Sequence, residues 1–229
     1  LRLLLFLSCV AALQACATQL RYSAEPIEAR VIDADTNQPL AGVIVVAHWS
    51  LRADGIYPGG SPYAGELMVM ETVTDKEGRF ALPGWGPKFA FGTFLEREAP
   101  ELILFKSDYH YERLLNRALT DFDVSVRRSE WSGKTIKMKQ FVDYRIQEGP
   151  TVTSAYARHL AFIKSSLNWA YRDWCDLKKA PRIVVALHLQ AMRFKERGIY
   201  SSLPTIDHVF DDKYGDPCNA RKTLERYMP

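Results

Sequence analysis

Residues 29–46 read ARVIDADTNQPLAGVIVV and divide into a strand, a polar turn and a second strand. The first part alternates apolar and polar side chains, which is typical of a strand with one buried face. Asp33 begins the turn, Pro39 fixes the direction in which the chain leaves it, and Gly42 allows another backbone segment to come close. The continuous apolar run 42–49 then predicts a buried strand.

Residues 71–80, ETVTDKEGRF, predict a second turn between two strands. We expect Asp75 to accept backbone N–H groups in this turn and Gly78 to adopt a positive φ. Phe80 then returns to the core as a packing anchor. Both stretches therefore predict antiparallel strands joined by tight turns.

Other short apolar runs follow at similar spacing, at 27–32, 67–73, 79–82, 102–105 and 134–138. Clusters rich in Asp, Asn, Gly and Pro separate several of them, at 33–39, 75–78 and 83–87. Short strands separated by turn signals favour a β-sandwich over a parallel sheet.

The two quoted stretches, in this order, resemble the carboxypeptidase regulatory-like domain. The resemblance covers roughly half of the chain and implies a prealbumin-like (transthyretin-like) seven-stranded β-sandwich over residues 26–140. Its turn and core positions are Asp33, Pro39, Gly42, Asp75, Gly78 and Phe80. An insert at 50–65 departs from the minimal pattern, and it is either an exposed loop or a binding loop.

The composition of the 229 residues is that of an ordinary globular protein, with 47% apolar and 25% charged residues. This argues against disordered, collagenous and polytopic membrane classes. The net charge of +3 does not favour nucleic acid as a partner. Residues 147–229 hold 13 basic and 9 acidic side chains. This excess predicts either a solvated face or a surface for anionic lipid, cell-wall polymer or an acidic partner.

The N-terminal residues predict an export signal. Residues 1–15 hold one charge, Arg2, and an apolar run shorter than the about 20 residues that cross a bilayer. Leu13-Gln-Ala-Cys16 resembles the lipobox of bacterial lipoproteins, which implies lipidation of Cys16. We therefore expect a signal peptide at 1–15, a tether at 16–25 and a protein held on the membrane, with the outer membrane favoured. An ordinary signal peptide with an unmodified Cys16 is the alternative.

Two cysteines, Cys175 and Cys218, remain in the predicted mature protein. In an oxidising compartment two such thiols usually form one disulfide. Two buried free thiols are the alternative. A metal site is less favoured, since neither residue belongs to a CxxC or paired His–Cys pattern.

Residues 141–229 predict a helical extension. Apolar side chains recur every three or four positions from Tyr156 to Trp174, with Thr153 or Ser154 as the N-cap. A second helix is predicted from Pro181 to Gly198, and a third begins at 216–217. A Cys175–Cys218 disulfide would then join the first helix to the third.

No catalytic constellation is evident. HExxH, Gly-x-Ser-x-Gly and phosphate-binding loops are absent from the sequence, so we predict no catalytic residue, metal or cofactor. Paired acidic residues in the two turns, Asp33/Asp35 and Asp75/Glu77, suit Ca²⁺ but are explained as turn residues.

Two weaker hypotheses involve aromatic and histidine side chains. His110, between Tyr109 and Tyr111, and Trp85 suit a sugar-stacking surface, although strand-edge packing explains them as well. A hydrolase would need His110 or His159 to meet a carboxylate in a pocket.

The favoured interpretation is a non-enzymatic bacterial envelope lipoprotein with a structural or binding role. Its predicted partners are the membrane, through Cys16, and an envelope protein or glycan. The alternative is a carbohydrate- or peptide-binding envelope module that uses the 50–65 insert.

Overall fold

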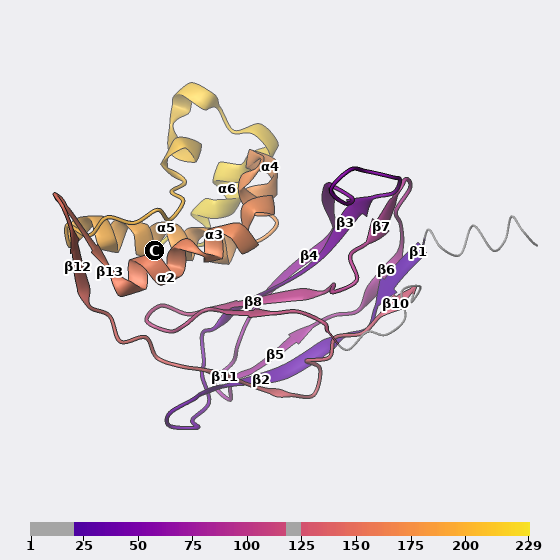
Figure 1. Ribbon diagram of the computed structural model, residues 1–229, viewed down its shortest axis with the longest axis horizontal. Coiled ribbons are helices and arrows are strands. Elements are labelled where there is room, and N and C mark those ends of the chain that lie inside the picture. Colours follow the sequence, from indigo (N-terminus) through magenta and orange to yellow (C-terminus); the bar gives the residue numbers. More distant parts are fainter. Residues whose placement is uncertain (1–20, 118–124) are drawn as a thin grey trace, which may run out of the picture.

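The computed structural model describes residues 21–117 and 125–229. The predicted signal peptide and Cys16 lie outside these residues. Figure 1 shows a sandwich of β-strands with a helical part packed along one side of it. The predicted fold, mainly β with a small C-terminal helical part, is confirmed.

The strands form three small sheets in the sandwich. The largest has the order β4 (Tyr63–Val73), β3 (Ile44–Ala53), β8 (Glu101–Phe105) and β9 (Glu112–Leu114), with β7 (Thr93–Leu95) also paired to β3. The second has the order β11 (Thr135–Met138), β2 (Ile27–Asp33) and β5 (Arg79–Leu82). The third has the order β10 (Val126–Arg127), β1 (Arg21–Ala24) and β6 (Trp85–Phe89).

Strand β3 has buried side chains on both faces. Val45 and Ala47 point into the sandwich core, together with Val31 and Phe80 of the β2 sheet. Val46 points the other way and packs with the helices. Because successive side chains of a strand alternate between faces, one continuous apolar run serves both cores.

All six predicted strands are present, and the differences lie between them. Strand β1 occupies part of the predicted tether, and β6 occupies most of the predicted turn 83–87. Strand β1 pairs with β6, and neither strand pairs with the strand that is next to it in the sequence. The part of the sandwich that the structure describes also holds more strands than the seven that the resemblance implies.

The two turns form as predicted. Asp33 Oδ1 accepts the backbone N–H groups of Asp35 and Thr36, and Asp75 Oδ1 accepts those of Glu77 and Arg79. Gly78 has φ of +72°, and a Cβ there would lie 2.3 Å from the Val31 carbonyl oxygen.

The remaining predicted turn and core positions also have clear structural roles. Pro39 lies opposite Ile32 in an isolated antiparallel bridge. Gly42 has φ of +74°, but a Cβ there would meet the Lys106 side chain at 3.5 Å and no backbone atom, so its positive φ and not the predicted backbone approach explains the glycine. Phe80 is buried in the sandwich core opposite Ala29.

The helical part departs from the prediction at its start. Residues 145–154, which precede the predicted first helix, form a hairpin of β12 (Arg145–Glu148) and β13 (Thr151–Ser154) that the sequence did not predict. Ser154 then caps the first helix, as its hydroxyl accepts the N–H of Ala157.

The predicted first helix is divided into short pieces. They are α2 (Ala155–Ala161), α3 (Ile163–Ser166), η1 (Asn168–Tyr171) and α4 (Trp174–Leu177). The second predicted helix is α5 (Pro181–Glu196), with proline at its start. Four short elements complete the chain: η2 (Asp207–Phe210), η3 (Asp212–Tyr214), η4 (Pro217–Asn219) and α6 (Ala220–Glu225). Among the described residues, no helix has the length and apolar character needed to cross a membrane.

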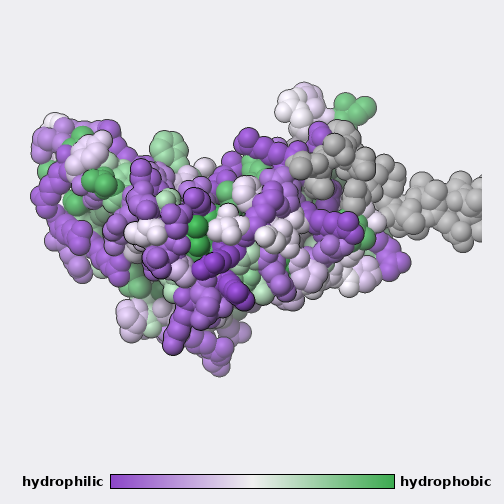
Figure 2. Space-filling view, turned by 90° about the horizontal axis from the view of Figure 1, so that it is seen from below, coloured by the Kyte–Doolittle hydropathy of each residue, from purple (hydrophilic) through white to green (hydrophobic). Residues whose placement is uncertain are grey.

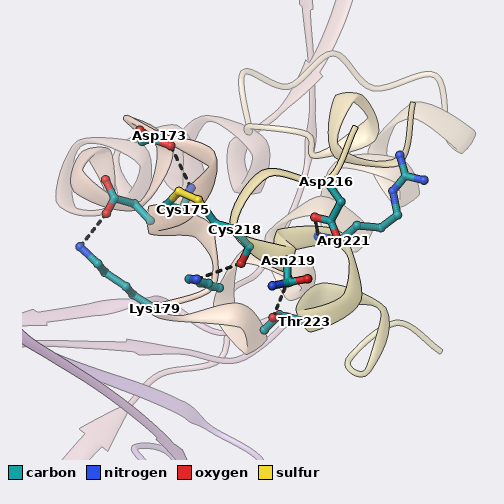
Figure 3. The surroundings of a disulfide bond; sticks show 10 residues. Asp173, Cys175, Lys179, Asp216, Cys218, Asn219, Arg221 and Thr223 are labelled. Atoms are coloured by element: carbon teal, nitrogen blue, oxygen red, sulfur yellow. Dashed lines mark hydrogen bonds and ion pairs between the residues drawn. A yellow bond between two sulfur atoms is a disulfide. The ribbon is translucent and has the colours of Figure 1, made fainter. Parts of the chain in front are cut away.

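A disulfide joins Cys175 of α4 to Cys218 of η4, with Cα atoms 5.4 Å apart (Figure 3). Asp173 Oδ1 accepts the N–H of Cys175, and the Lys178 ammonium donates to the Cys218 carbonyl. The predicted pairing is therefore present, and it links α4 to the segment just before α6.

Candidate functional site

A polar pocket of about 340 Å³ lies between the largest sheet and the helical part. The sheet contributes strands β3, β4, β8 and β9, and the helical part contributes the segment from α3 to the residue after η1. The side chains used below are His48, Ser50, Arg52, Tyr63, Glu66, Glu96, Glu98, Glu101, Arg113, Trp169 and Arg172.

Strand β3 supplies three of these side chains at alternate positions, His48, Ser50 and Arg52. Alternation places them on one face of the sheet. The pairing partners continue the polar surface, since Glu66 lies opposite Ser50 and Glu101 lies opposite His48.

The buried Glu66 carboxylate is the centre of a hydrogen-bond network. It accepts hydrogen bonds from the Ser50 hydroxyl at 3.1 Å and from the Tyr63 hydroxyl at 3.1 Å. Its Oε2 lies 3.2 Å from Nδ1 of His48. A buried carboxylate is tolerated when such donors replace water, and Glu66 has three of them.

His48 lies between two carboxylates. Its Nε2 is 3.7 Å from Glu101 Oε1, which is an ion-pair distance but longer than a hydrogen bond. Burial opposes the charged imidazolium, but the carboxylates of Glu101 and Glu66 outweigh burial and raise the pKa of His48 to about 9. His48 is therefore charged at neutral pH.

Arg113 holds Glu101 from the other side. Its guanidinium donates to both carboxylate oxygens, at 2.6 and 2.9 Å. Burial acts to raise the pKa of Glu101, yet the interactions with His48 and Arg113 prevail and lower it. Arg52 forms a similar pair with Glu96, with Nη2 2.6 Å from Oε1.

The helical part closes the pocket with Trp169 and Arg172. The Trp169 ring lies 5.4 Å from the His48 ring, centroid to centroid. The Arg172 guanidinium lies 4.7 Å from the centroid of the Tyr63 ring, in a cation–π contact. Arg172 has no carboxylate partner among the described residues.

Two buried donors at this pocket have no hydrogen-bond acceptor in the part of the chain that the structure describes. They are Nε1 of Trp169 and Nε2 of His48. A buried N–H group without an acceptor costs about 1–3 kcal/mol, so such groups need an explanation. Both residues line the pocket, where a bound ligand would offer further acceptors.

The arrangement does not fit a serine nucleophile activated by His48. A serine nucleophile needs a neutral base to take its proton. His48 is charged at neutral pH, and the Ser50 hydroxyl already donates to Glu66. Four basic and four acidic side chains line the described pocket, so its charges balance.

The predicted turn residues do not form a second site. Both Asp33 oxygens are used, since Oδ2 accepts the Tyr109 hydroxyl. Hydrogen bonds from the Thr36 backbone and from Tyr109 lower the pKa of Asp33. Across residues 21–117 and 125–229, no three His, Cys, Asp or Glu side chains are grouped to hold a metal ion.

The structure brings His110 and His159 together but leaves Trp85 elsewhere. The two histidine rings are 4.7 Å apart and both contact Phe141. Neither histidine has an ion pair with a carboxylate among the described residues. Trp85 instead packs edge-on against Trp49 at 5.3 Å. The proposed sugar-stacking surface is therefore not formed as a unit.

The insert at 50–65 is strand at both ends, with a loop at 54–62 between them. Residues up to 53 extend β3 and those from 63 begin β4, which places Ser50, Arg52 and Tyr63 at the pocket. Sequence reasoning missed His48, although a single histidine inside an apolar strand run was a usable signal. Nothing local marked Glu101, Trp169 or Arg172.

No protein-family model matches the chain, and no curated protein matches its sequence. Among solved structures, the 3-chlorocatechol 1,2-dioxygenase from Rhodococcus opacus 1CP is 19% identical over 52% of this chain and 61% of its own, with a TM-score of 0.30. The group B streptococcus pilus 2b backbone protein is 16% identical over 51% and 41%, with a TM-score of 0.25. The chain thus covers less than two thirds of either. At these TM-scores neither similarity indicates an activity or a ligand.

Proposed function

We propose that the chain is a non-enzymatic, lipid-anchored protein of the bacterial cell envelope that binds a saccharide in the pocket around His48 and Trp169. The observation that carries the binding role is the pair of buried donors at this pocket, Trp169 Nε1 and His48 Nε2, that lack acceptors among the described residues.

The chemistry of the lining supports a saccharide. Sugar hydroxyls both donate and accept, and the pocket offers donors such as Arg172 beside acceptors such as Glu98. Balanced lining charges disfavour a strongly charged ligand. The polar surface also disfavours a purely apolar one.

The anchor and the domain family rest on sequence resemblance. The lipobox-like LQAC sequence supports lipidation of Cys16, and the turn motifs support a carboxypeptidase regulatory-like sandwich. A disulfide between Cys175 and Cys218 agrees with an oxidising compartment.

Glycan-array and peptidoglycan pull-down assays test the binding role. Trp169→Phe removes the indole N–H, and Arg172→Ala removes a rim donor. A lost hydrogen bond of about 1.4 kcal/mol weakens binding roughly tenfold. Arg128→Ala is the control, because Arg128 pairs with Glu25 on the sandwich away from the pocket, and it should bind normally.

Two results would reject this proposal. One is glycan binding that is unchanged in both pocket variants. The other is the absence of binding to every glycan tested. Binding of peptides alone would assign the pocket to a peptide ligand instead.

Growth with labelled palmitate tests the anchor separately. The wild-type chain should carry the label and Cys16→Ser should not. Label that is absent from the wild type, or that persists in the variant, would reject lipidation at Cys16.

A further inference from the structure

The exposed large hydrophobic side chains of the sandwich gather at one end of it. They are Ile56, Tyr57, Phe89, Phe91, Phe94 and Val126, and we call this group the apolar tip. They come from the β3–β4 turn, β6, the β6–β7 turn, β7 and β10, which lie together in Figure 1. Backbone bonding ties the two turns to each other, as Asp54 N–H donates to the Gly92 carbonyl at 3.0 Å.

The centre of the apolar tip is a pair of stacked phenylalanines. The Phe89 and Phe91 rings are 5.6 Å apart and nearly parallel. Phe89 is 54% exposed and Phe91 is 73% exposed. Figure 2 shows that hydrophilic residues cover most of the face drawn there, with hydrophobic ones in small separate groups. Exposed aromatic groups of this kind mark a contact surface.

The apolar tip is close along the chain to the proposed lipid-bearing residue. Arg21 of β1 pairs with Phe89 of β6. Five residue steps separate Cys16 from Arg21, and an extended chain covers roughly 17 Å over that number. A lipid on Cys16 therefore keeps Arg21, beside Phe89 of the apolar tip, within about half a bilayer thickness of the membrane surface.

The charge around the stacked pair suits a membrane surface as well. The Arg21 guanidinium lies 5.3 Å from the centroid of the Phe89 ring, and Lys88 precedes Phe89 in β6. Aromatic side chains flanked by cations are typical of segments that enter the boundary between head groups and acyl chains. Cations near the surface also attract anionic lipids.

We propose that the apolar tip is a membrane-contacting surface, with Phe89 and Phe91 inserted among the phospholipids beside the lipid on Cys16. This inference rests on the lipid anchor in the proposed function. Two attachments, one covalent and one through side chains, fix the orientation of the protein on the membrane. A single attachment does not.

Photo-cross-linking in cells tests this surface with the full chain. p-Benzoylphenylalanine replaces Phe91 in one variant and Phe162 in the other. Phe162 is the matched control, because it is 67% exposed on the helical part. Cells are grown with radioactive phosphate and illuminated, and the phospholipid adduct is measured per molecule of protein. We expect several-fold more adduct at position 91 than at 162.

Equal labelling at the two positions, no lipid adduct at 91, or a cross-link from 91 to protein or to a second copy instead of lipid would overturn the proposal. Palmitate labelling of the same variants separates the two proposals. Palmitate without a lipid adduct at 91 rejects the membrane-contacting surface and leaves the anchor intact. A lipid adduct at 91 without palmitate supports the surface and rejects the anchor.

Discussion

The Nδ1 atom of His48 lies 3.2 Å from Oε2 of Glu66, in the interior of a pocket that faces the helical part. With Glu101 on its other side, His48 is a buried cation held by two carboxylates. Burying charged groups costs desolvation free energy. Here the charged groups line a polar cavity between the sheet and the helices, where a continuous apolar interface would otherwise form.

We expect the pKa of His48 to be near 9 in the folded protein, against 6.5 for the ordinary side chain. The folded state then binds more protons than the unfolded state between these values. The contribution of His48 to the free energy of unfolding is therefore full below pH 6.5, and it is lost as the pH rises through about 9. Histidine NMR titration measures the pKa directly.

Glu66→Gln provides the control for this titration. Removing one of the two carboxylates should move the pKa of His48 down, because the attraction to the imidazolium is weaker. A wild-type His48 that titrates at or below 6.5 would show that burial, rather than the carboxylates, dominates.

Glu71 predicts a second pH dependence in a lower range. Its carboxylate accepts the N–H groups of Arg182 and Ile183 at the start of α5. Burial nevertheless raises the pKa of Glu71 to about 7. The folded state binds the extra proton between pH 4.5 and 7, so stability falls as the pH rises through this range.

Glu71→Gln should flatten this part of the stability profile, measured by urea unfolding at a series of pH values. Glu28→Gln is the control, since Glu28 is exposed on β2. A profile between pH 4.5 and 7 that is the same in Glu71→Gln and the wild type would contradict the prediction.

The double variant Cys175→Ala/Cys218→Ala should lose stability. The disulfide closes a loop with a sequence separation of 43, for which chain entropy gives up to about 4 kcal/mol. Urea unfolding followed by tryptophan fluorescence measures the loss. Mobility on non-reducing gels that does not differ between the wild type and the double variant would show that the bond is not formed in the protein.

Gly78→Ala should be more harmful than Gly133→Ala. Both glycines have positive φ, which costs an alanine about 1–2 kcal/mol. A Cβ at Gly133 meets open space, whereas at Gly78 it meets backbone atoms of Val31 and Leu40. We expect Gly78→Ala to cost at least about 2 kcal/mol more in the free energy of unfolding. Equal losses of stability in the two variants would mean that the backbone around Gly78 shifts to make room for the Cβ, and would contradict the prediction.

Local patterns predicted the elements whose signals are contained in short stretches. The turns at Asp33 and Asp75 formed because each aspartate bonds to backbone groups two to four residues away. Strand β1 was missed because its partners, β6 and β10, are distant in sequence. The hairpin at 145–154 was missed despite the turn residues Gly149 and Pro150, because the region was interpreted as helical throughout.

Local sequence patterns could not predict the pocket, because its residues are also distant in sequence. Glu66, Glu101 and Trp169 belong to three elements, and only the packing of sheet against helices brings them to His48. The periodic apolar pattern from Tyr156 to Trp174 predicted one helix. Instead, Ser154 caps α2 and Asp173 caps α4, so the chain is divided and Trp169 lies in the short η1.

The most direct test of the binding role is the indole N–H signal of Trp169 in two-dimensional NMR, recorded while muropeptides and neutral oligosaccharides are added. We predict a saturable shift of this signal, weakened in Arg172→Ala. The signal of Trp49, which is buried in the sandwich core, should stay unchanged. A Trp169 signal that responds to no saccharide, or that shifts equally in Arg172→Ala, would contradict the proposed site.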